Sequence, residues 1–390
     1  MTSAVVLGAG IGGLAAGVAL ARRGWSVTVH ERASSLEPVG AGIALAPNAL
    51  RALDALGVGD AVRGMARLSG EVGLRRPDGH WLVRADVTAT GERLGDTAVV
   101  LHRSQLVDLL AAALPAGALR LGEEVTSVAP GVPGGASAVV SVAGRAGDPP
   151  ADLPADLVVA ADGIDSPTRH TLFPDHPGPT YTGVTAWRFV AAAPPGGVEP
   201  AETWGRGSIV GLTPLADGRV YCYLTAVLPE GTRFDDEAGE LRRRFGGWHA
   251  PLPDLLADLD AAAVLHHDLR WLATPLPRFD VGRVALLGDA AHAMPPNLGQ
   301  GGCQALEDAV VLAAAVDDAP LGTGLAAYSA ARLPRTTRIA RMSAQISGPT
   351  TWTSGTAVAL RDLGMRVAGR FAGPLMERRL QDVVGWHPPA

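Results

Sequence analysis

Hydrophobic residues near the N-terminus fall into two short runs separated by a helix-like segment. The runs AVVLGAG (4–10) and SVTVHER (26–32) are apolar over most of their length, as buried parallel strands are. Between them, GGLAAGVALARRG (12–24) has helical spacing and ends in the glycine that is typical of a helix C-terminus. The pattern therefore predicts a strand–helix–strand unit.

Three glycines stand where the first strand meets the helix. Gly8, Gly10 and Gly13 have the spacing G-x-G-x-x-G. We expect the first to permit a tight turn, the second to let a pyrophosphate approach the backbone, and the third to let helix and strand pack closely. Glu31 ends the second strand, near the usual distance of about 20 residues for a ribose-binding acid. The unit predicts an adenine dinucleotide site, and the pair Glu31–Arg32 leaves FAD and a nicotinamide both open.

Two later apolar runs each end in an acid beside a glycine. The segment LPADLVVAADGIDSPTR (153–169) breaks at Asp162, and GRVALLGDAAHAMPPNLGQGG (282–302) breaks at Asp289. Ligands of doubly wound folds bind outside the carboxyl ends of parallel strands. Both acids are therefore expected at the ligand-binding edge of the same sheet.

The middle of the chain has a different pattern. Alternating, aromatic-bearing runs at 181–192, 202–215 and 218–229 are separated by Gly, Pro and Asp turns, as in an antiparallel sheet. An earlier hairpin, EVGLRRPDGHWLVRADV (71–87), is expected to join them. From about residue 325 the spacing predicts surface helices that Pro334 and Pro349 interrupt.

Composition narrows the function classes. The 390 residues are 47% hydrophobic and 18% charged, and the net charge of −6 includes no basic block that would favour nucleic acid. All 33 cations are arginine, which excludes a pyridoxal Schiff base, a P-loop lysine and a Tyr-Lys dehydrogenase pair. Two distant cysteines fit a reducing cytoplasm and form no CxxC metal site. The uncharged stretch 4–21 holds five glycines, so we expect a cytoplasmic protein with no stable membrane insertion.

With these motifs in order, the chain resembles the class A, single-component FAD-dependent aromatic hydroxylases of the p-hydroxybenzoate hydroxylase fold. Their fingerprints are the N-terminal GxGxxG, a central D-G and a C-terminal G-D. The segments GAGIALAPNALRALDALG (40–57) and LHRSQLVDLL (101–110) are similar as well. The resemblance covers roughly residues 3–340. It implies an α/β fold with an FAD-binding Rossmann-like domain of the glutathione reductase type, an antiparallel β-sheet substrate domain and C-terminal helices.

The expected domains are discontinuous. The FAD-binding domain takes residues 1–70, 96–175 and 280–325, the substrate domain takes 71–95 and 176–279, and a C-terminal helical segment takes 326–390.

The resemblance also implies which residues contact FAD. Asp289 would hold the ribityl chain, and Arg103 and Gln105 would reach toward the pyrophosphate or ribityl. A helix beginning near Cys303 would direct its positive end at the flavin, where reduction leaves negative charge. The glycines before this helix lack side chains, so the backbone can approach the flavin ring. The full expected set is Gly8, Gly10, Gly13, Glu31, Arg32, Arg103, Gln105, Asp162, Asp289, Gly299, Gly301 and Gly302.

Substrate contacts are expected from the β-rich middle and the G-D loop. Pro295 and Pro296 would form a rigid wall where flavin and substrate meet, with the Pro295 carbonyl available as a polar contact. Arg188 is similar in position to an arginine that reaches flavin or substrate in relatives, but Trp187 and Arg188 cannot both face the flavin because strand residues alternate. His292 is expected to be structural. The expected catalytic residues are Arg188 and Pro295, and the expected substrate residues are Trp187, Trp204, Tyr221, Tyr223 and Pro296.

The implied reaction is a monooxygenation. NADPH or NADH reduces FAD, O2 adds at flavin C4a, and the hydroperoxide delivers a hydroxyl to an aromatic or polycyclic small molecule. The absence of a second GxGxxG agrees with transient nicotinamide binding. A flavin-linked reductase or dehydrogenase, an epoxidase, an antibiotic-inactivating monooxygenase and a non-catalytic flavin-binding protein remain open, as do a monomer and a homodimer. No nucleic acid partner and no metal are expected.

Overall fold

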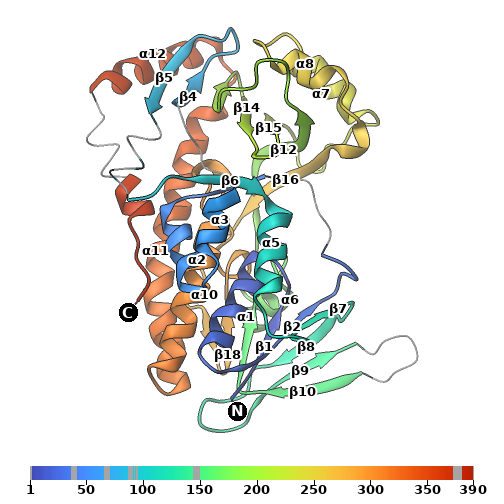
Figure 1. Cartoon of the computed structure of the whole chain (residues 1–390), viewed down its shortest axis with the longest axis vertical. Helices are drawn as coiled ribbons and strands as arrows, with labels where there is room; N and C mark the ends of the chain where they lie inside the picture. The colour runs from blue at the N-terminus through green and yellow to red at the C-terminus, as the bar shows by residue number, and fades with distance from the viewer. Residues whose placement is uncertain are drawn as a thin grey trace.

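The computed structural model of the chain describes residues 2–36, 42–65, 71–86, 91, 93, 95–143, 150–371 and 380–389 (Figure 1). Parts of the segments quoted above, at 40–41, at residue 87 and at 372–379, lie outside the described residues.

A six-stranded sheet forms the lower body of the molecule (Figure 1). Its order is β17-β18-β11-β1-β2-β7, with parallel pairs from β18 to β7 and an antiparallel edge at β17. Helix α1 (Ile11–Arg22) joins β1 to β2, so the predicted strand–helix–strand unit is confirmed. The strands are β1 (Ser3–Leu7), β2 (Ser26–Glu31), β7 (Leu119–Leu121), β11 (Leu157–Ala160), β17 (Asp280–Val281) and β18 (Val284–Leu286).

Two smaller sheets accompany it. One is a three-stranded antiparallel sheet at the base of the molecule in Figure 1, of β8 (Val125–Ala129), β9 (Ala138–Val142) and β10 (Ala151–Ala155). The other pairs β3 (Gly42–Leu45) with β6 (Val99–His102).

A seven-stranded sheet lies above the first one, with the order β16-β12-β15-β14-β13-β4-β5. The hairpin β4–β5 joins it through a parallel pair, β13 with β4, while its other pairs are antiparallel. Its strands are β4 (Glu71–Arg75), β5 (Trp81–Asp86), β12 (Thr180–Ala192), β13 (Ala201–Trp204), β14 (Ser208–Pro214), β15 (Arg219–Val227) and β16 (Leu265–Trp271).

The helices cover the sheets in two groups. Helices α1, α2 and α10 enclose the main core against the six-stranded sheet, while α7 and α8 enclose a second core against one face of the seven-stranded sheet. Besides α1, the described residues form the helices α2 (Pro47–Ala55), α3 (Gly59–Met65), α5 (Arg103–Ala112), α6 (Pro167–Leu172), α7 (Glu237–Phe245), α8 (Leu252–Ala257), α9 (Asp289–His292), α10 (Gly301–Asp317), α11 (Leu321–Thr350) and α12 (Gly355–Phe371), and the 3-10 turns η1 (Ala261–Ala263) and η2 (Pro296–Leu298).

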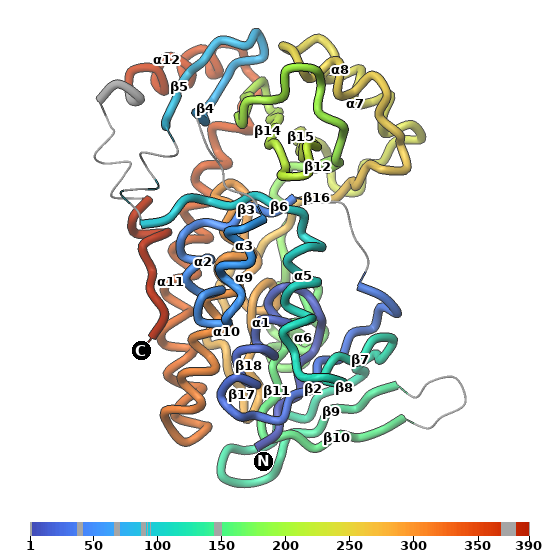
Figure 2. The backbone as a smooth tube through the Cα atoms, in the orientation of Figure 1, coloured from blue at the N-terminus to red at the C-terminus, as the bar shows by residue number. Residues whose placement is uncertain are grey.

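The prediction that prolines interrupt the C-terminal helices is wrong. Helix α11 continues through Pro334 and Pro349 and runs along the side of the molecule, as the tube in Figure 2 shows. A proline inside a helix costs about 3 kcal/mol. Burial of Tyr328 and Ile339 on the same helix contributes stabilisation that opposes this cost. No helix in the described part of the chain is long and apolar enough to cross a membrane.

Candidate active site

A cavity of about 500 Å³ lies between the glycine-rich loops of the six-stranded sheet and one face of the seven-stranded sheet. Its volume is within the range of about 300–1,000 Å³ for small-molecule sites. The expected site residues that line it are Gly10, Arg103, Arg188, Tyr221, Tyr223, Asp289, Pro295, Pro296, Gly299, Gly301 and Gly302. The remaining expected residues lie behind or beside it.

The three N-terminal glycines have distinct surroundings. Gly8 has a φ of +94°, and a Cβ there would lie 2.6 Å from the Ala161 carbonyl oxygen. A Cβ on Gly13 would overlap the Gly8 carbonyl, so the predicted tight turn and close packing are both present. Gly10 has no atom within 4 Å of a hypothetical Cβ and borders the cavity. The backbone at Gly10 is thus open to a ligand.

Glu31 is tied to this turn. Its carboxylate accepts hydrogen bonds from the backbone N–H groups of Ala9 and Ala33, both at 2.9 Å. The side chain is therefore held at the end of β2 beside the glycines. Arg32 is exposed and does not line the cavity.

Asp162 ends β11 as predicted but points into its own loop. One carboxylate oxygen accepts a hydrogen bond from the Thr168 backbone at 3.1 Å, while Oδ1 is buried without a partner in the described part of the chain. The adjacent Gly163 has a φ of +84° and lines the cavity. Asp162 shapes the loop that reaches the cavity, and its spare oxygen is free to accept one further donor.

The G-D segment and the loop after it form the cavity's floor. Gly288 has a φ of +62°, which turns the chain so that Asp289 begins α9 with an exposed carboxylate in the cavity. Gly299 has a φ of +61°, and a Cβ on Gly301 would meet nothing within 4 Å. At Gly302 the space is taken by Ile43, whose Cδ1 would lie 2.8 Å from a Cβ.

Helix α10 starts at Gly301, two residues before the predicted Cys303. Its first N–H groups therefore belong to residues that line the cavity. A helix N-terminus favours negative charge by about 0.3–2 kcal/mol. The helix thus supplies the electrostatic environment expected for an anionic ring.

A buried polar network holds both ends of this floor from behind. Asp308 accepts hydrogen bonds from the Gly288 backbone at 2.9 Å and from His292 Nε2 at 2.5 Å. Arg332 donates to Asp308 at 2.6 Å and to Glu307 at 2.5 Å, and all of these side chains are buried. The bonded, buried His292 agrees with its expected structural role.

The same network reaches the loop through two amides. Asn48 donates to the carboxamide oxygen of Gln300 at 3.0 Å and to Glu307 at 2.7 Å. Gln300 is the residue before α10, so the network fixes the position at which that helix starts.

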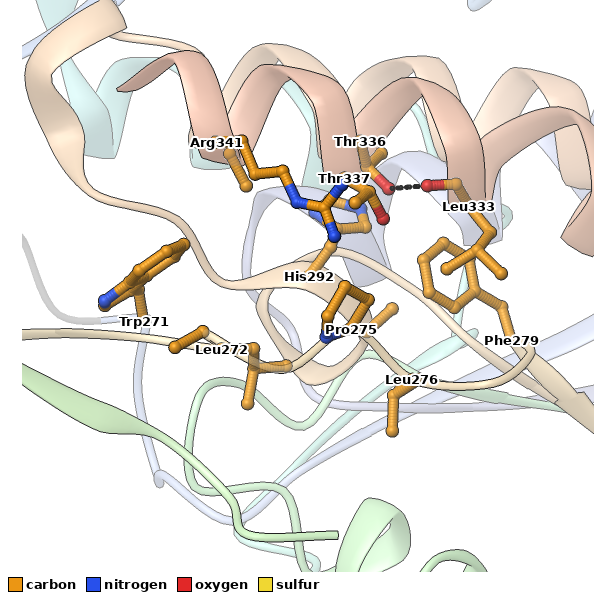
Figure 3. Close-up of a pocket in the computed structure, with 13 residues that line it drawn as sticks. Trp271, Leu272, Pro275, Leu276, Phe279, His292, Leu333, Thr336, Thr337 and Arg341 are labelled. Atoms are coloured by element: carbon orange, nitrogen blue, oxygen red, sulfur yellow. Dashed lines mark hydrogen bonds between the residues drawn. The ribbon is translucent and has the colours of Figure 1, made fainter. Parts of the chain in front are cut away.

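His292 also borders a second, small cavity between α11 and the segment after β16. Its volume of about 20 Å³ is enough for about one water molecule. Figure 3 shows its lining, which includes His292, Thr337 and Arg341. The other ring nitrogen of His292, Nδ1, is buried without a partner in the described part of the chain. This cavity belongs to the support behind the loop and is too small for a substrate.

The Pro295 carbonyl already has one partner within the protein, and its availability to a ligand stays a prediction. It accepts a hydrogen bond from Ser343 Oγ on α11 at 2.6 Å, and that serine is buried. The Pro295 and Pro296 rings do line the cavity. These prolines are therefore a wall anchored to α11, and the carbonyl is already engaged.

Strand alternation resolves the choice between Trp187 and Arg188. Arg188 lines the cavity, whereas Trp187 is fully buried in the core under α7 and α8. Trp187 Nε1 donates to Glu237 at 2.6 Å, and its ring stacks on His266. The expectation of Trp187 as a substrate residue is thus wrong, because its face of the sheet is the one that packs on helices.

Two more expectations need correction. Gln105 caps α5, where its side chain accepts a hydrogen bond from the His102 backbone at 3.1 Å, and it does not line the cavity. Trp204 does not line it either, since its Nε1 donates to Glu202 at 2.8 Å beside the cavity wall.

Sequence reasoning missed Glu202, which lines the cavity and accepts hydrogen bonds from Trp204 and Tyr223. The signal was present, because an acid two residues before Trp204 in an alternating strand must lie on the same face as that aromatic ring. Ser347 and Thr350 of α11 also line the cavity, and the broken-helix expectation concealed them.

Comparisons with known proteins agree with this geometry. Residues 1–343 match the family model of the FAD binding domain. The aurachin C monooxygenase/isomerase of Stigmatella aurantiaca is 37% identical over 368 residues, covering 93% of each chain. The FAD-dependent urate hydroxylase of Klebsiella pneumoniae is 32% identical over 340 residues, covering 85% of this chain and 86% of the other.

A solved structure is similar over nearly the whole chain. Klebsiella pneumoniae HpxO complexed with FAD and uric acid has a TM-score of 0.88 and 27% identity, covering 98% of this chain and 96% of that one. The family match spans most of the sequence, and relatives above 30% identity align over most of their length. The chain belongs to the class A, single-component FAD-dependent monooxygenases.

Proposed function

We propose that the protein hydroxylates a planar aromatic or polycyclic small molecule in the 500 Å³ cavity, using O2 and electrons from NADPH or NADH. One observation carries the proposal: both glycine clusters and one polar face of the seven-stranded sheet border the same cavity. The names of similar proteins support the substrate class, since they include urate, a quinolone and an aminohydroxybenzoate.

The residues present fit FAD. The open backbone at Gly10 and Gly301 forms a cradle that side chains would fill, and Asp289 presents an exposed carboxylate to it. We assign Asp289 to the ribityl hydroxyls, Arg103 to the phosphates and Glu31 to the adenosine ribose. When bound, the flavin supplies electron transfer and oxygen activation.

The chain's own groups then do three things. Pro295, Pro296 and the sheet shield the ring from water, which strengthens electrostatic interactions inside the cavity. The N-terminus of α10 stabilises negative charge on the ring. Arg188 faces the substrate side and favours an electron-rich or anionic group there. We also propose that the chain divides into an FAD-binding domain, a substrate domain and a C-terminal helical segment with the bounds expected from the sequence.

The test of function measures NADPH or NADH oxidation, O2 consumption and product mass with a panel of aromatic compounds. A product that gains one oxygen atom supports the proposal. If O2 consumption yields only peroxide with every compound, or if NADPH or NADH is oxidised without O2, the result favours a flavin-linked reductase or dehydrogenase. The position of the added oxygen separates hydroxylation from epoxidation.

The FAD cradle is tested by Gly301→Val and Gly299→Val. The first puts a side chain into open cavity space, and the second forces valine into a left-handed backbone that costs at least about 1–2 kcal/mol. Both variants should lose bound FAD or change its absorbance spectrum. Matched controls are Gly364→Val, an open helical glycine, and Gly117→Val, an open glycine with a φ of +75°. Unaltered FAD binding in both loop variants contradicts the proposal.

A further inference from the structure

The cavity face of the seven-stranded sheet changes from charged to apolar along its strands. Arg188 and Glu202 lie in one row across the sheet and line the charged end of the cavity. Two residues earlier on β12, Ala186 lies in one row with Ile209 of β14, and Val184 begins the row after that. Strand residues two apart share a face, and these three line the cavity. The sheet therefore gives the cavity a second end made mainly of aliphatic side chains.

Most hydroxyl groups at this apolar end are already bonded within the protein. Thr350 Oγ1 donates to the Ser347 carbonyl at 2.8 Å, and Ser347 Oγ donates to Asn297 Oδ1 at 2.7 Å. Thr182 Oγ1 donates to a carbonyl of its own strand at 3.4 Å. Thr225 Oγ1 accepts a bond from a backbone N–H of β14 at 3.2 Å and keeps its own proton. Few polar groups are thus left at this end for a ligand to bond.

The apolar end lies one layer of backbone from an exposed apolar surface. Gly207, which has a φ of +61°, lines the cavity. Its N–H donates to the Trp352 carbonyl at 2.8 Å, and its carbonyl accepts from the Val227 N–H at 2.9 Å. The Trp352 and Val227 side chains are 42% and 39% exposed. A Cβ on Gly207 would lie 2.9 Å from Thr353, so glycine keeps the wall between cavity and surface thin.

Helix α12 extends this exposed apolar surface. It lies beside β5 at the top of the molecule, where α11 ends (Figure 1). Arg361, which is buried, ties the helix to the wall by donating to the Gly205 carbonyl at 3.1 Å. On the opposite face of the helix, Leu360, Leu363 and Val367 are all more than half exposed.

This clustering is informative because exposed apolar patches mark places where a protein binds something apolar. Seven large apolar side chains are exposed in the described part of the chain, and five of them belong to α12 or to the two segments that bond Gly207. The patch is continuous with the cavity end through Gly207, so the occupant that fits best is one that reaches from the cavity to the surface.

We infer that the substrate is an aromatic ring with a linear apolar chain. Its ring lies between the flavin side of the cavity and Arg188, and its chain runs over Ile209, past Gly207, to Trp352 and the exposed face of α12. Ile209 and Trp352 are the residues that set this specificity. The inference rests on the proposed function and deepens it, because it names the substituent that the ring carries. A ring with a short or charged substituent leaves the apolar end unfilled.

The test measures binding of phenol and 4-alkylphenols, from ethyl to heptyl, to the FAD-loaded protein. The change in flavin absorbance reports binding without turnover. In the unaltered protein the dissociation constant should fall roughly two- to fourfold for each added CH2, the gain expected when a methylene group is buried.

Two variants and a matched control locate the chain. Ile209→Phe fills the apolar end, so phenol should bind within twofold of the unaltered protein while the gain with chain length disappears. Trp352→Ala should weaken binding of the longest members alone, because shorter chains end before they reach the surface. Leu380→Ala removes a side chain of similar exposure, 38%, that does not line the cavity, and should leave the whole series unchanged.

Several results would overturn the inference. They are failure of every alkylphenol to bind, an affinity that stays flat or falls with chain length, or an Ile209→Phe variant that keeps the full gain. If Ile209→Phe does not fold, equal weakening of heptylphenol binding by Trp352→Ala and Leu380→Ala overturns it. A flat series in a protein that sediments with phosphatidylcholine vesicles would instead assign the α12 face to membrane contact. The proposed function fails separately, on product mass and O2 consumption, so the two failures are distinguishable.

Discussion

Arg332 is buried and Arg188 is half-buried, and their surroundings are opposite. Arg332 of α11 donates to Asp308, to Glu307 and to both oxygens of Gln304, and it is 1% exposed. Arg188 of β12 has no such partner in the described part of the chain and faces a cavity. The difference separates two uses of an arginine. The closed network of Arg332 with Glu307 and Asp308 holds the loop that shapes the site, whereas Arg188 faces the cavity and is available to a ligand.

The first prediction breaks the closed network. Arg332→Met leaves Glu307 and Asp308 buried without their shared cation, which typically costs about 3–5 kcal/mol. We expect the free energy of unfolding in urea to fall by that amount, with loss of FAD affinity because Asp308 positions Gly288. Arg23→Met removes a partly exposed pair with Asp317 and should cost less than about 1 kcal/mol. Similar losses in the free energy of unfolding for Arg332→Met and Arg23→Met would contradict the view that the buried network matters more than a surface ion pair.

The second prediction removes the open cation. Arg188→Met should lower kcat/KM for the substrate by roughly 10- to 100-fold, because a hydrogen bond to a charged group contributes about 1.5–3 kcal/mol. The free energy of unfolding should change by less than about 1 kcal/mol, since no partner is left unpaired. Steady-state kinetics and urea unfolding of the same preparation give both numbers. A large loss of stability with unchanged kinetics would make Arg188 structural after all.

The contrast also explains what could be predicted from sequence. Glycine spacing and acid-ended strands fix local backbone geometry, so the strand–helix–strand unit was predicted correctly, and Asp289 and Gly299 line the cavity while their FAD contacts stay a prediction. Trp187 was misplaced because alternation shows that two neighbours face opposite sides but not which side packs on helices. Only the later placement of α7 and α8 decides that.

The closed network of Arg332 could not be predicted from the sequence for a related reason. Glu307, Asp308 and Arg332 look like charges on surface helices until α10 and α11 pack together. Pro334, two residues after Arg332, suggested that the helix is interrupted there. Tertiary packing overrides local propensity at this position, and no short stretch of sequence carries that information.

The third prediction concerns how the stability of the closed network changes at low pH. Burial alone would raise the pKa of Asp308, but the charges and hydrogen bonds of His292 and Arg332 outweigh burial and lower it to about 2. A depressed pKa stabilises the fold above the unfolded value of about 3.9, and this contribution is lost as pH falls toward 2. Between pH 5 and pH 2 the unaltered protein should therefore lose about 2 kcal/mol more than Asp308→Asn. Urea unfolding across this range measures the difference, and parallel curves would show that Asp308 is not held as a carboxylate.

The last prediction has the smallest expected effect on stability and tests the contact between Tyr223 and Glu202 on the cavity face of the sheet. Gly211→Ala adds a methyl group where the Tyr223 ring lies, so the ring must tilt and its hydroxyl must leave Glu202. Relief of glycine's strand penalty, about 0.5–1 kcal/mol, offsets an off-rotamer cost of about 0.5–1.5 kcal/mol, so the free energy of unfolding should change by less than about 1 kcal/mol. The kcat/KM for the substrate should nevertheless fall, because Tyr223 and Glu202 both line the cavity and their contact is lost.

A double variant isolates the cause of that change. If Gly211 acts only by letting the Tyr223 hydroxyl reach Glu202, then adding Gly211→Ala to Tyr223→Phe should lower kcat/KM no further, since the hydroxyl is already absent. An additional loss of kcat/KM in the double variant would mean that the methyl group blocks the ligand itself. Non-additivity between residues in contact is the signature that a shared interaction has been lost. The result decides whether the flat tyrosine, rather than the space above Gly211, is what the sheet face presents to its substrate.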